Sequence, residues 1–165
     1  RAERGIKVIS LKDIRWRRPD IKSVSLLANA LARQAAYIAG ADEAWMLDDE
    51  GYVTEGSACN AWIITSSREV VTRPAENSIL RGVTRTVLID LIRQEGLTLV
   101  ERPFTIEEAK AAEEAFNTAA VTLITPVVSI DGVAIGDGQP GPMTKRFRAR
   151  FHNVAEWSDG YQLLT

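Results

Sequence analysis

The sequence predicts an α+β domain in which helices surround one mixed sheet. By length, the 165 residues favour a single domain, and 45% hydrophobic with 25% charged residues is ordinary globular composition. Short apolar segments bounded by turn residues occur together with longer segments whose apolar residues recur at helical spacing. The two kinds of segment do not alternate strictly as strand and helix, so a mixed or largely antiparallel sheet is favoured over a doubly wound one.

The first half of the chain is predicted to hold one helix and several strands. Residues 5–9 form a short strand, and a polar run from Asp13 to Ser23 follows it. A helix then begins with Ser23 or Ser25 as N-cap and ends at Gly40. Its apolar face consists of Leu27, Ala30, Leu31, Ala35 and Ile38. Four further strands, separated by turn residues, are predicted at 44–47, 52–54, 61–65 and 69–72.

The second half is predicted to hold three helices and three strands. One helix begins after Gly82 and ends at Gly96, with an apolar face of Val83, Val87, Leu88, Leu91 and Ile92. A short helix opens with a capping box formed by Thr105 and Glu108. The last helix covers about residues 143–156, and 158–165 form a C-terminal tail. The strands are expected at 97–100, 115–121 and 126–130.

Composition excludes several classes of function. A net charge of −2 disfavours nucleic-acid binding, which requires a basic surface. The single cysteine, Cys59, rules out an internal disulfide framework, and the single histidine, His152, leaves zinc sites and histidine-dependent triads poorly supplied, so no metal is expected. No apolar stretch approaches the ~20 residues of a membrane span, and no signal-peptide pattern opens the chain. These features predict a cytoplasmic protein that does not bind membranes.

Residues 136–141 match the dinucleotide motif G-x-G-x-x-G, but a structural turn is the favoured interpretation. The motif binds dinucleotides only between a strand and a helix, with an acidic residue at the end of a second strand. Here no second strand follows, and Pro140 and Pro142 stiffen the loop. Similarly, His152 is interpreted as a packing or surface residue and Cys59 as a small buried side chain. A solvated basic face is the interpretation for Arg146, Arg148 and Arg150.

Three other features suggest chemistry. Lys22 is one of only five lysines and directly precedes the first helix, so burial that favours the neutral amine is one interpretation, although the residues alone favour a surface lysine. Glu55 lies among small residues between two strands, where it can approach a planar ligand closely. Residues 80–85 form a glycine turn that opens a helix, whose free N–H groups suit a phosphate. Together these are the parts needed to hold pyridoxal phosphate.

These residues resemble the class IV pyridoxal-phosphate-dependent aminotransferases over about residues 13–150. The segment from Asp13 to Lys22 is similar to the catalytic-lysine segment of the D-amino-acid branch. The spacing from Glu55 through Asn60 to residues 82–85 is similar to the signature of the whole class. The resemblance implies a fold-type-IV large domain, a pseudo-barrel of mixed strands with surrounding helices. It also implies homodimers that exchange an amino group between a D-amino acid and a 2-oxo acid.

The resemblance also implies a role for each site residue. Lys22 forms the internal aldimine with pyridoxal 5′-phosphate and moves the proton between Cα and C4′. Glu55 pairs with the pyridine nitrogen, Arg15 lies near the phenolic oxygen, and Leu80 packs on the ring. The backbone N–H groups of Val83 and Thr84 and the Thr84 hydroxyl bind the phosphate from one side. The loop of Thr118, Ala119 and Ala120 closes the phosphate site from the other side.

Some positions depart from the family pattern. Ala58, Ala119 and Ala120 stand where the D-amino-acid branch tends to carry hydroxyls, and Trp62 stands where the signature usually has Phe or Tyr. Residues 1–157 are expected to be the large domain alone, without the smaller N-terminal domain of family members. The chain is therefore expected to have impaired activity by itself. Three alternatives remain open: a branched-chain L-amino-acid aminotransferase, an aminodeoxychorismate lyase and a non-catalytic truncated module.

Overall fold

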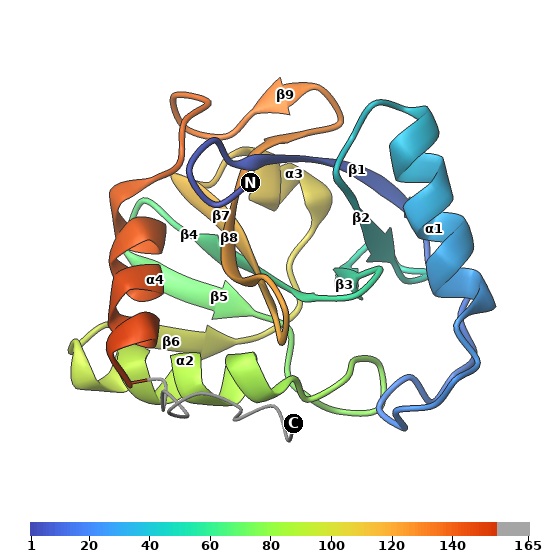
Figure 1. The fold of residues 1–165 in the computed structure, drawn as a ribbon, viewed down its shortest axis with the longest axis horizontal. Helices are drawn as coiled ribbons and strands as arrows, with labels where there is room; N and C mark the ends of the chain where they lie inside the picture. Colours follow the sequence, from blue (N-terminus) through green and yellow to red (C-terminus); the bar gives the residue numbers. More distant parts are fainter. Residues whose placement is uncertain (155–165) are drawn as a thin grey trace, which may run out of the picture.

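One curled sheet organises the fold, with helices on its outside and the short helix Ile106–Lys110 packed against its inner core (Figure 1). The computed structural model describes residues 1–154. Within them, the first half contains β1 (Ile6–Lys12), α1 (Leu27–Ile38), β2 (Glu43–Leu47), β3 (Val53–Gly56), β4 (Asn60–Ile64) and β5 (Glu69–Thr72). The second half contains α2 (Val83–Gln94), β6 (Thr98–Glu101), α3 (Ile106–Lys110), β7 (Glu114–Ala119), β8 (Leu123–Ile130), β9 (Val133–Ala134) and α4 (Pro142–Val154).

The sheet is mixed, in the order β3-β2-β1-β8-β7-β4-β5-β6. β1 runs parallel to both of its neighbours and β5 runs parallel to β6, whereas the other pairs are antiparallel. The sheet curls until its two edges meet, because Val53 N donates to Phe104 O at 2.9 Å and Tyr52 forms a bridge with Thr105. This half-barrel with helices around it confirms the predicted fold class.

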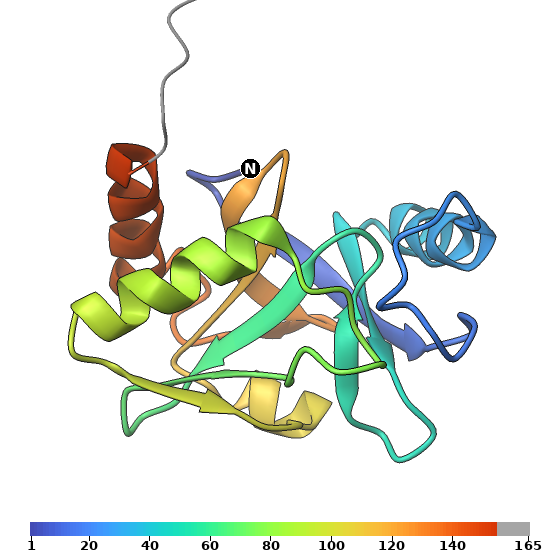
Figure 2. The ribbon, with the colours of Figure 1, turned by 90° about the horizontal axis from the view of Figure 1, so that it is seen from below.

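Apolar side chains fill the inside of the curl and cover its outer face. Inside, Trp45 packs edge-on against Phe104. Outside, α2 and α4 pack on the face of β4 and β7 that carries Trp62 and Phe116. Helix α1 lies at the other end of the molecule, beside β1 and β2 (Figure 2). Between α1 at one end and the pair of α2 and α4 at the other, the ends of several strands are therefore not covered by any helix of residues 1–154.

The apolar face predicted for α1 is wrong. Leu27, Leu31 and Ile38 are 74%, 51% and 76% exposed, and the buried residues of the helix are Ala32 and Ala36. These alanines are also four apart, and their small side chains let the helix lie close to the sheet. Neither Ser23 nor Ser25 caps the helix, which begins later, after Leu26, with no side-chain cap.

The other elements agree with the prediction to within a few residues, except that the short strand β9 was not predicted. In α2, Thr84 and Arg85 are buried, whereas Val83 and Val87 are exposed. The capping box on α3 is half formed: Thr105 Oγ1 accepts from Glu108 N at 3.1 Å, but the Glu108 carboxylate binds Arg102 instead of reaching back. No helix within residues 1–154 is long and apolar enough to cross a membrane. The tail predicted at 158–165 lies outside the described residues.

The glycine-rich motif at residues 136–141 is a structural turn, as predicted. Gly136 and Gly138 have φ values of 56° and 75°, a left-handed conformation that favours glycine. The turn leads into α4, whose first N–H groups donate to the carboxylate of Glu114 on β7. This carboxylate fills the place that a nucleotide phosphate would need.

Candidate active site

A cavity of about 530 Å³ opens between α1, the start of α2 and the ends of β3 and β7. This volume is in the range of small-molecule sites. All nine candidate residues from the sequence line it, although they come from four separate segments of the chain. These residues are Arg15, Lys22, Glu55, Leu80, Val83, Thr84, Thr118, Ala119 and Ala120.

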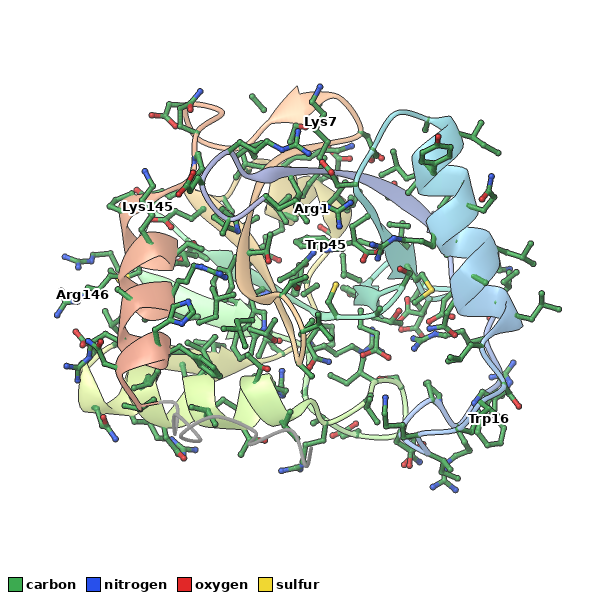
Figure 3. The ribbon with its side chains drawn as sticks, in the orientation of Figure 1. Arg1, Lys7, Trp16, Trp45, Lys145 and Arg146 are labelled. Carbon is green, nitrogen blue, oxygen red and sulfur yellow. The ribbon has the colours of Figure 1, made fainter. Side chains whose placement is uncertain are left out.

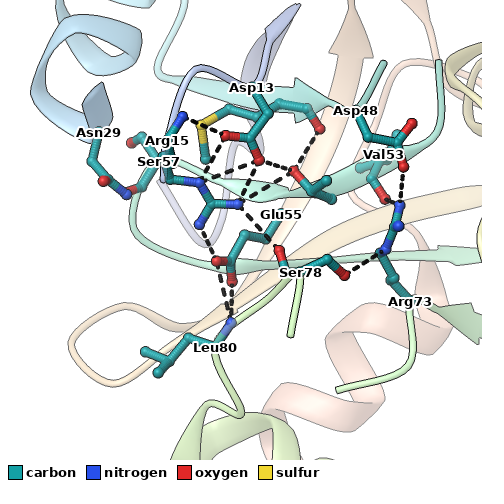
Figure 4. Close-up of polar contacts among 12 residues, drawn as sticks. Asp13, Arg15, Asn29, Asp48, Val53, Glu55, Ser57, Arg73, Ser78 and Leu80 are labelled. Carbon is teal, nitrogen blue, oxygen red and sulfur yellow. Dashed lines mark hydrogen bonds and ion pairs between the residues drawn. The ribbon is translucent and has the colours of Figure 1, made fainter. Parts of the chain in front are cut away.

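Glu55 is a buried carboxylate at the end of β3, only 6% exposed. It accepts hydrogen bonds from Arg15 Nη1 and from Leu80 N at 3.2 Å (Figure 4). It also accepts one from Asn60 Nδ2 at 3.0 Å. Burial raises the pKa of Glu55 above its usual value, although the charge of Arg15 acts in the opposite direction. The carboxylate is therefore held in one position while it still borders the cavity.

Arg15 lies against Glu55 and is itself fixed by Asp13. Its Nε and Nη2 donate to the two oxygens of Asp13 at 3.0 and 2.6 Å, and Thr54 Oγ1 donates to the same carboxylate at 2.8 Å. Burial opposes ionisation of Asp13, but the hydrogen bonds and charge of Arg15 hold its pKa below the usual value. Sequence reasoning gave Asp13 no role, although its spacing from Arg15 is the signal that identifies the pair.

The turn after Glu55 is compact, as its small residues suggest. Gly56 N donates to Cys59 O at 2.8 Å, and a Cβ at position 56 would come within 2.3 Å of Cys59 Sγ. Buried Glu43 accepts from Ser57 N at 3.2 Å, which ties the turn to β2. Burial raises the pKa of the Cys59 thiol well above its usual value, so this thiol stays protonated and is a poor nucleophile.

The start of α2 faces the cavity without a cap. Gly82 is the N-cap residue and has no side chain, and the first turn of the helix contains no acidic residue. The backbone N–H groups and the positive end of the helix dipole are thus available to an anion. Thr84 Oγ1 donates its proton to Ala119 O at 3.0 Å, which joins α2 to the end of β7.

Lys22 lines the cavity, and its exposed side chain agrees with the surface lysine that the residues alone favour. It is exposed, on the segment of residues 13–26 that joins β1 to α1 without regular structure. The apolar neighbours Ile21 and Val24 are themselves 46% and 95% exposed, so they provide no apolar interior for the ammonium. Trp16, on the same segment, lies at the edge of the molecule (Figure 3).

Comparison with known proteins identifies the family. The family model "Amino-transferase class IV" matches residues 2–130. The chain belongs to the class IV aminotransferases. It is 38% identical to a D-alanine aminotransferase of Bacillus licheniformis over 92% of the chain and 53% of that protein. It is 40% identical to a putative branched-chain-amino-acid aminotransferase of Methanocaldococcus jannaschii over 82% of the chain and 47% of that protein.

Solved structures of the family have the same fold. The branched-chain amino acid aminotransferase of Thermobaculum terrenum, in its PLP-form, superposes with a TM-score of 0.86 at 29% identity, over 92% of the chain and 51% of that protein. The chain thus spans about half the length of the relatives it matches. The recognition of a class IV aminotransferase from the sequence is confirmed.

The α4 residues singled out in the sequence do not line the cavity. The basic residues of α4 are not simply solvated: Arg146 and Arg150 pair with Glu95, and Arg148 Nη1 donates to Thr122 O at 2.9 Å. His152 lies on the same helix and is partly buried. The three arginines therefore contact the rest of the domain, although Arg146 and Arg150 remain exposed.

Sequence reasoning gave no role to two residues that organise the site. Asn60 Nδ2 donates to both Glu55 Oε2 and Leu80 O, and thereby joins the two sides of the cavity. Glu43 is 5% exposed and also binds Arg33 of α1 at 2.7 Å. Asn60 belongs to the quoted class signature. Glu43 could have been found as the one charged residue in an otherwise apolar strand.

Proposed function

We propose that this chain binds pyridoxal 5′-phosphate and supplies Lys22 for transamination between a D-amino acid and a 2-oxo acid. One observation carries the proposal: a single cavity brings together a lysine, a buried carboxylate and an uncapped helix start. The three come from the segment before α1, from β3 and from α2. An amine, a ring-nitrogen partner and an anion site are the groups that this cofactor requires.

The donor set matches the two ends of the cofactor. Glu55 would hold the proton on the pyridine nitrogen, because its carboxylate is buried and kept in place by Arg15 and Asn60. The N–H groups of Val83 and Thr84 would bind the phosphate. A bound pyridoxal phosphate supplies a ring that stabilises negative charge on the carbon that loses its proton. Lys22 would carry that proton, and Leu80 would pack on the ring.

The roles of two residues are narrower in this proposal than the resemblance implies. Arg15 is engaged by Asp13 and Glu55, so we assign it to the orientation of Glu55. Thr84 gives its hydroxyl proton to Ala119 O, so we assign phosphate binding to its backbone N–H. Ala119 and Ala120 contribute backbone only.

The test is covalent labelling. The purified chain is mixed with pyridoxal phosphate and reduced with borohydride, and the modified lysine is mapped by mass spectrometry. We expect label on Lys22 alone. Lys22→Gln should abolish it, and Lys145→Gln, at an exposed residue on α4, should leave it unchanged. Glu55→Gln should keep the label but change the absorbance spectrum of the bound cofactor. Label scattered over several lysines, or absent, would overturn the proposal.

The D-amino-acid substrate is the finer part of the proposal. It is supported by the similarity to a D-alanine aminotransferase and by the segment from Arg15 to Lys22. The relative from Methanocaldococcus jannaschii favours a branched-chain substrate as the second candidate. A panel of D- and L-amino acids with 2-oxoglutarate, assayed on a protein of the relatives' length, decides between them, and turnover of L-leucine but not of D-alanine would reverse the order. Release of pyruvate from aminodeoxychorismate would identify a lyase.

We also propose that residues 1–157 act as a cofactor-binding large domain, which a second domain covers in the working enzyme. The relatives are about twice as long, and exposed apolar side chains border the cavity. Trp16, Ile21, Leu26 and Val83 are 51%, 46%, 57% and 70% exposed. Rapid transamination by the 165-residue chain would contradict this arrangement. Failure of Lys22 to react even in a protein of the relatives' length would instead identify a non-catalytic module.

A cytoplasmic homodimer completes the proposal. Leu27, Leu31 and Ile38 form an exposed apolar strip on α1 that a second copy would cover. The single cysteine suits a reducing compartment. Sedimentation at several protein concentrations tests the dimer, and Leu31→Lys should shift the protein toward monomer without changing the cavity.

A further inference from the structure

Trp62 connects the buried core to the phosphate end of the cavity. It lies on β4, is fully buried, and stacks on Phe116 with the ring centroids 5.6 Å apart and an angle of 7° between the planes. On the indole lies Arg85, whose guanidinium carbon is 5.1 Å from the ring centroid. The indole Nε1 donates to Thr118 Oγ1 at 2.9 Å. Its ring is therefore fixed by its neighbours, and its only polar atom points at a residue of the cavity wall.

Thr118 accepts this hydrogen bond, and its hydroxyl proton remains available for a ligand. The side chain is 2% exposed and lines the cavity. A hydroxyl can donate one hydrogen bond and accept two. Trp62 uses one acceptor position, and among residues 1–154 the hydroxyl donates no hydrogen bond of its own. Because the indole fixes the direction of one lone pair, it also restricts where the O–H can point.

Thr84, the other threonine that lines this end of the cavity, has no hydroxyl proton available for a ligand. Thr84 Oγ1 donates to Ala119 O at 3.0 Å, so its proton is already used. Ala119 and Ala120 offer no side-chain donor. Of the two threonines that line this part of the cavity, only Thr118 has a proton available for a ligand.

Arg85 makes the arrangement rigid. It is 1% exposed, and its two terminal nitrogens donate to Thr72 Oγ1 at 2.7 Å and Glu101 Oε1 at 2.6 Å. A cation held over an indole is attracted to the ring face, which opposes rotation of the ring. Phe116 stacks on the same indole and restricts it further.

We propose that Trp62 is a positioning residue for phosphate binding: its indole N–H orients the Thr118 hydroxyl so that this hydroxyl donates to the phosphate group in the cavity. The inference rests on the proposed function, in which the cavity binds pyridoxal phosphate. It adds a side-chain donor to a site that otherwise offers backbone N–H groups, and it gives the buried indole a purpose beyond packing.

The test compares two ligands that differ only in the phosphate. Trp62→Phe keeps an aromatic ring on Phe116 but removes the N–H donor, and Thr118→Val removes the hydroxyl. For each variant the affinities for pyridoxal phosphate and for pyridoxal are measured by absorbance titration. A hydrogen bond to a charged group is worth about a tenfold change in affinity or more. Both variants should therefore bind pyridoxal phosphate about tenfold more weakly and bind pyridoxal as the parent chain does.

Trp45→Phe is the matched control. Trp45 is equally buried, and its Nε1 donates to Asn117 Oδ1 at 2.8 Å, but Asn117 does not line the cavity. This variant should lose a similar amount of stability toward urea and keep the parent ratio of the two affinities. The double variant Trp62→Phe/Thr118→Val should bind pyridoxal phosphate no more weakly than Thr118→Val alone, because both changes remove the same contact.

The titrations separate the positioning role of Trp62 from cofactor binding by the cavity. Equal weakening of both ligands in Trp62→Phe, or additive losses in the double variant, would overturn the positioning role while the proposed function stands. Absence of pyridoxal phosphate binding in the parent chain would overturn the proposed function and this inference together. A phosphate-specific loss in Trp62→Phe but not in Trp45→Phe supports the role.

Discussion

Two helix starts in this molecule look alike in sequence but do different things. Both α2 and α4 follow a glycine-containing loop, and both come close to the strand β7. At the beginning of β7, Glu114 places its carboxylate on the N–H groups of Met143 and Thr144. At the end of β7, Thr118 lies near the start of α2, which has no side-chain cap and borders the cavity. Whether a helix start can bind a ligand therefore depends on the side chains that the neighbouring strand places against it. The glycine pattern of the preceding loop does not reveal those side chains.

The largest expected effect comes from removing the Glu114 carboxylate from the start of α4. Glu114→Ala removes two backbone contacts and one from the Thr144 hydroxyl, so we expect the free energy of unfolding to fall by about 2–3 kcal/mol in urea titrations. Inorganic phosphate should then stabilise the variant more than the parent, since the freed N–H groups can bind it. Glu107→Ala removes only an exposed pair with Lys110 and should cost less than about 1 kcal/mol. Equal costs for the two variants would contradict the comparison.

A matched pair of glycine variants separates stability from binding. A Cβ on Gly82 would lie 2.4 Å from Asn60 Oδ1, and one on Gly141 would lie 2.0 Å from the carboxyl carbon of Glu114. Gly82→Ala and Gly141→Ala should each cost about 1–2 kcal/mol through crowding. Only Gly82→Ala should also weaken pyridoxal phosphate binding, because Asn60 holds Glu55. Weaker binding in Gly141→Ala as well would mean that the two helix starts are coupled.

The smallest effects are expected from the two threonines in the first turns. Thr84→Val removes the hydrogen bond to Ala119 O, and Thr144→Val removes one to Glu114, so each should cost about 1 kcal/mol of stability. Since the Thr84 proton is already used within the protein, Thr84→Val should weaken pyridoxal phosphate binding less than Thr118→Val does. The reverse order in titrations would assign the phosphate contact to the Thr84 hydroxyl.

Sequence reasoning grouped residues that the structure brings together around one cavity, and their roles stay predictions. Glu55, Leu80 and Thr84 come from segments far apart in the chain, and the resemblance placed them in one site before any geometry was known. The glycine motif at 136–141 was correctly interpreted as a turn, because the context that a dinucleotide site needs was missing.

Sequence reasoning was wrong where the burial of a helix residue depends on neighbours that are distant in the sequence. The apolar spacing in α1 pointed to Leu27 and Leu31, but the closeness of the helix to β2 selects Ala32 and Ala36 instead. Lys22, just before this helix, is exposed, in agreement with the surface lysine that the residues alone favour. The error concerns the side of the molecule where large apolar side chains have no cover among the described residues.

The central position of β1 has a consequence for how the chain folds. On one side β1 pairs with β2, where Val8 is opposite Glu43, and on the other it pairs with β8, where Val8 is opposite Ile130. The first pairing can form early during synthesis, but the second must wait for β8, which follows β1 by more than a hundred residues in the chain. Contacts so distant in sequence slow folding. Until β8 arrives, one edge of β1 stays open, which makes this strand the place where a growing chain is most exposed to wrong partners.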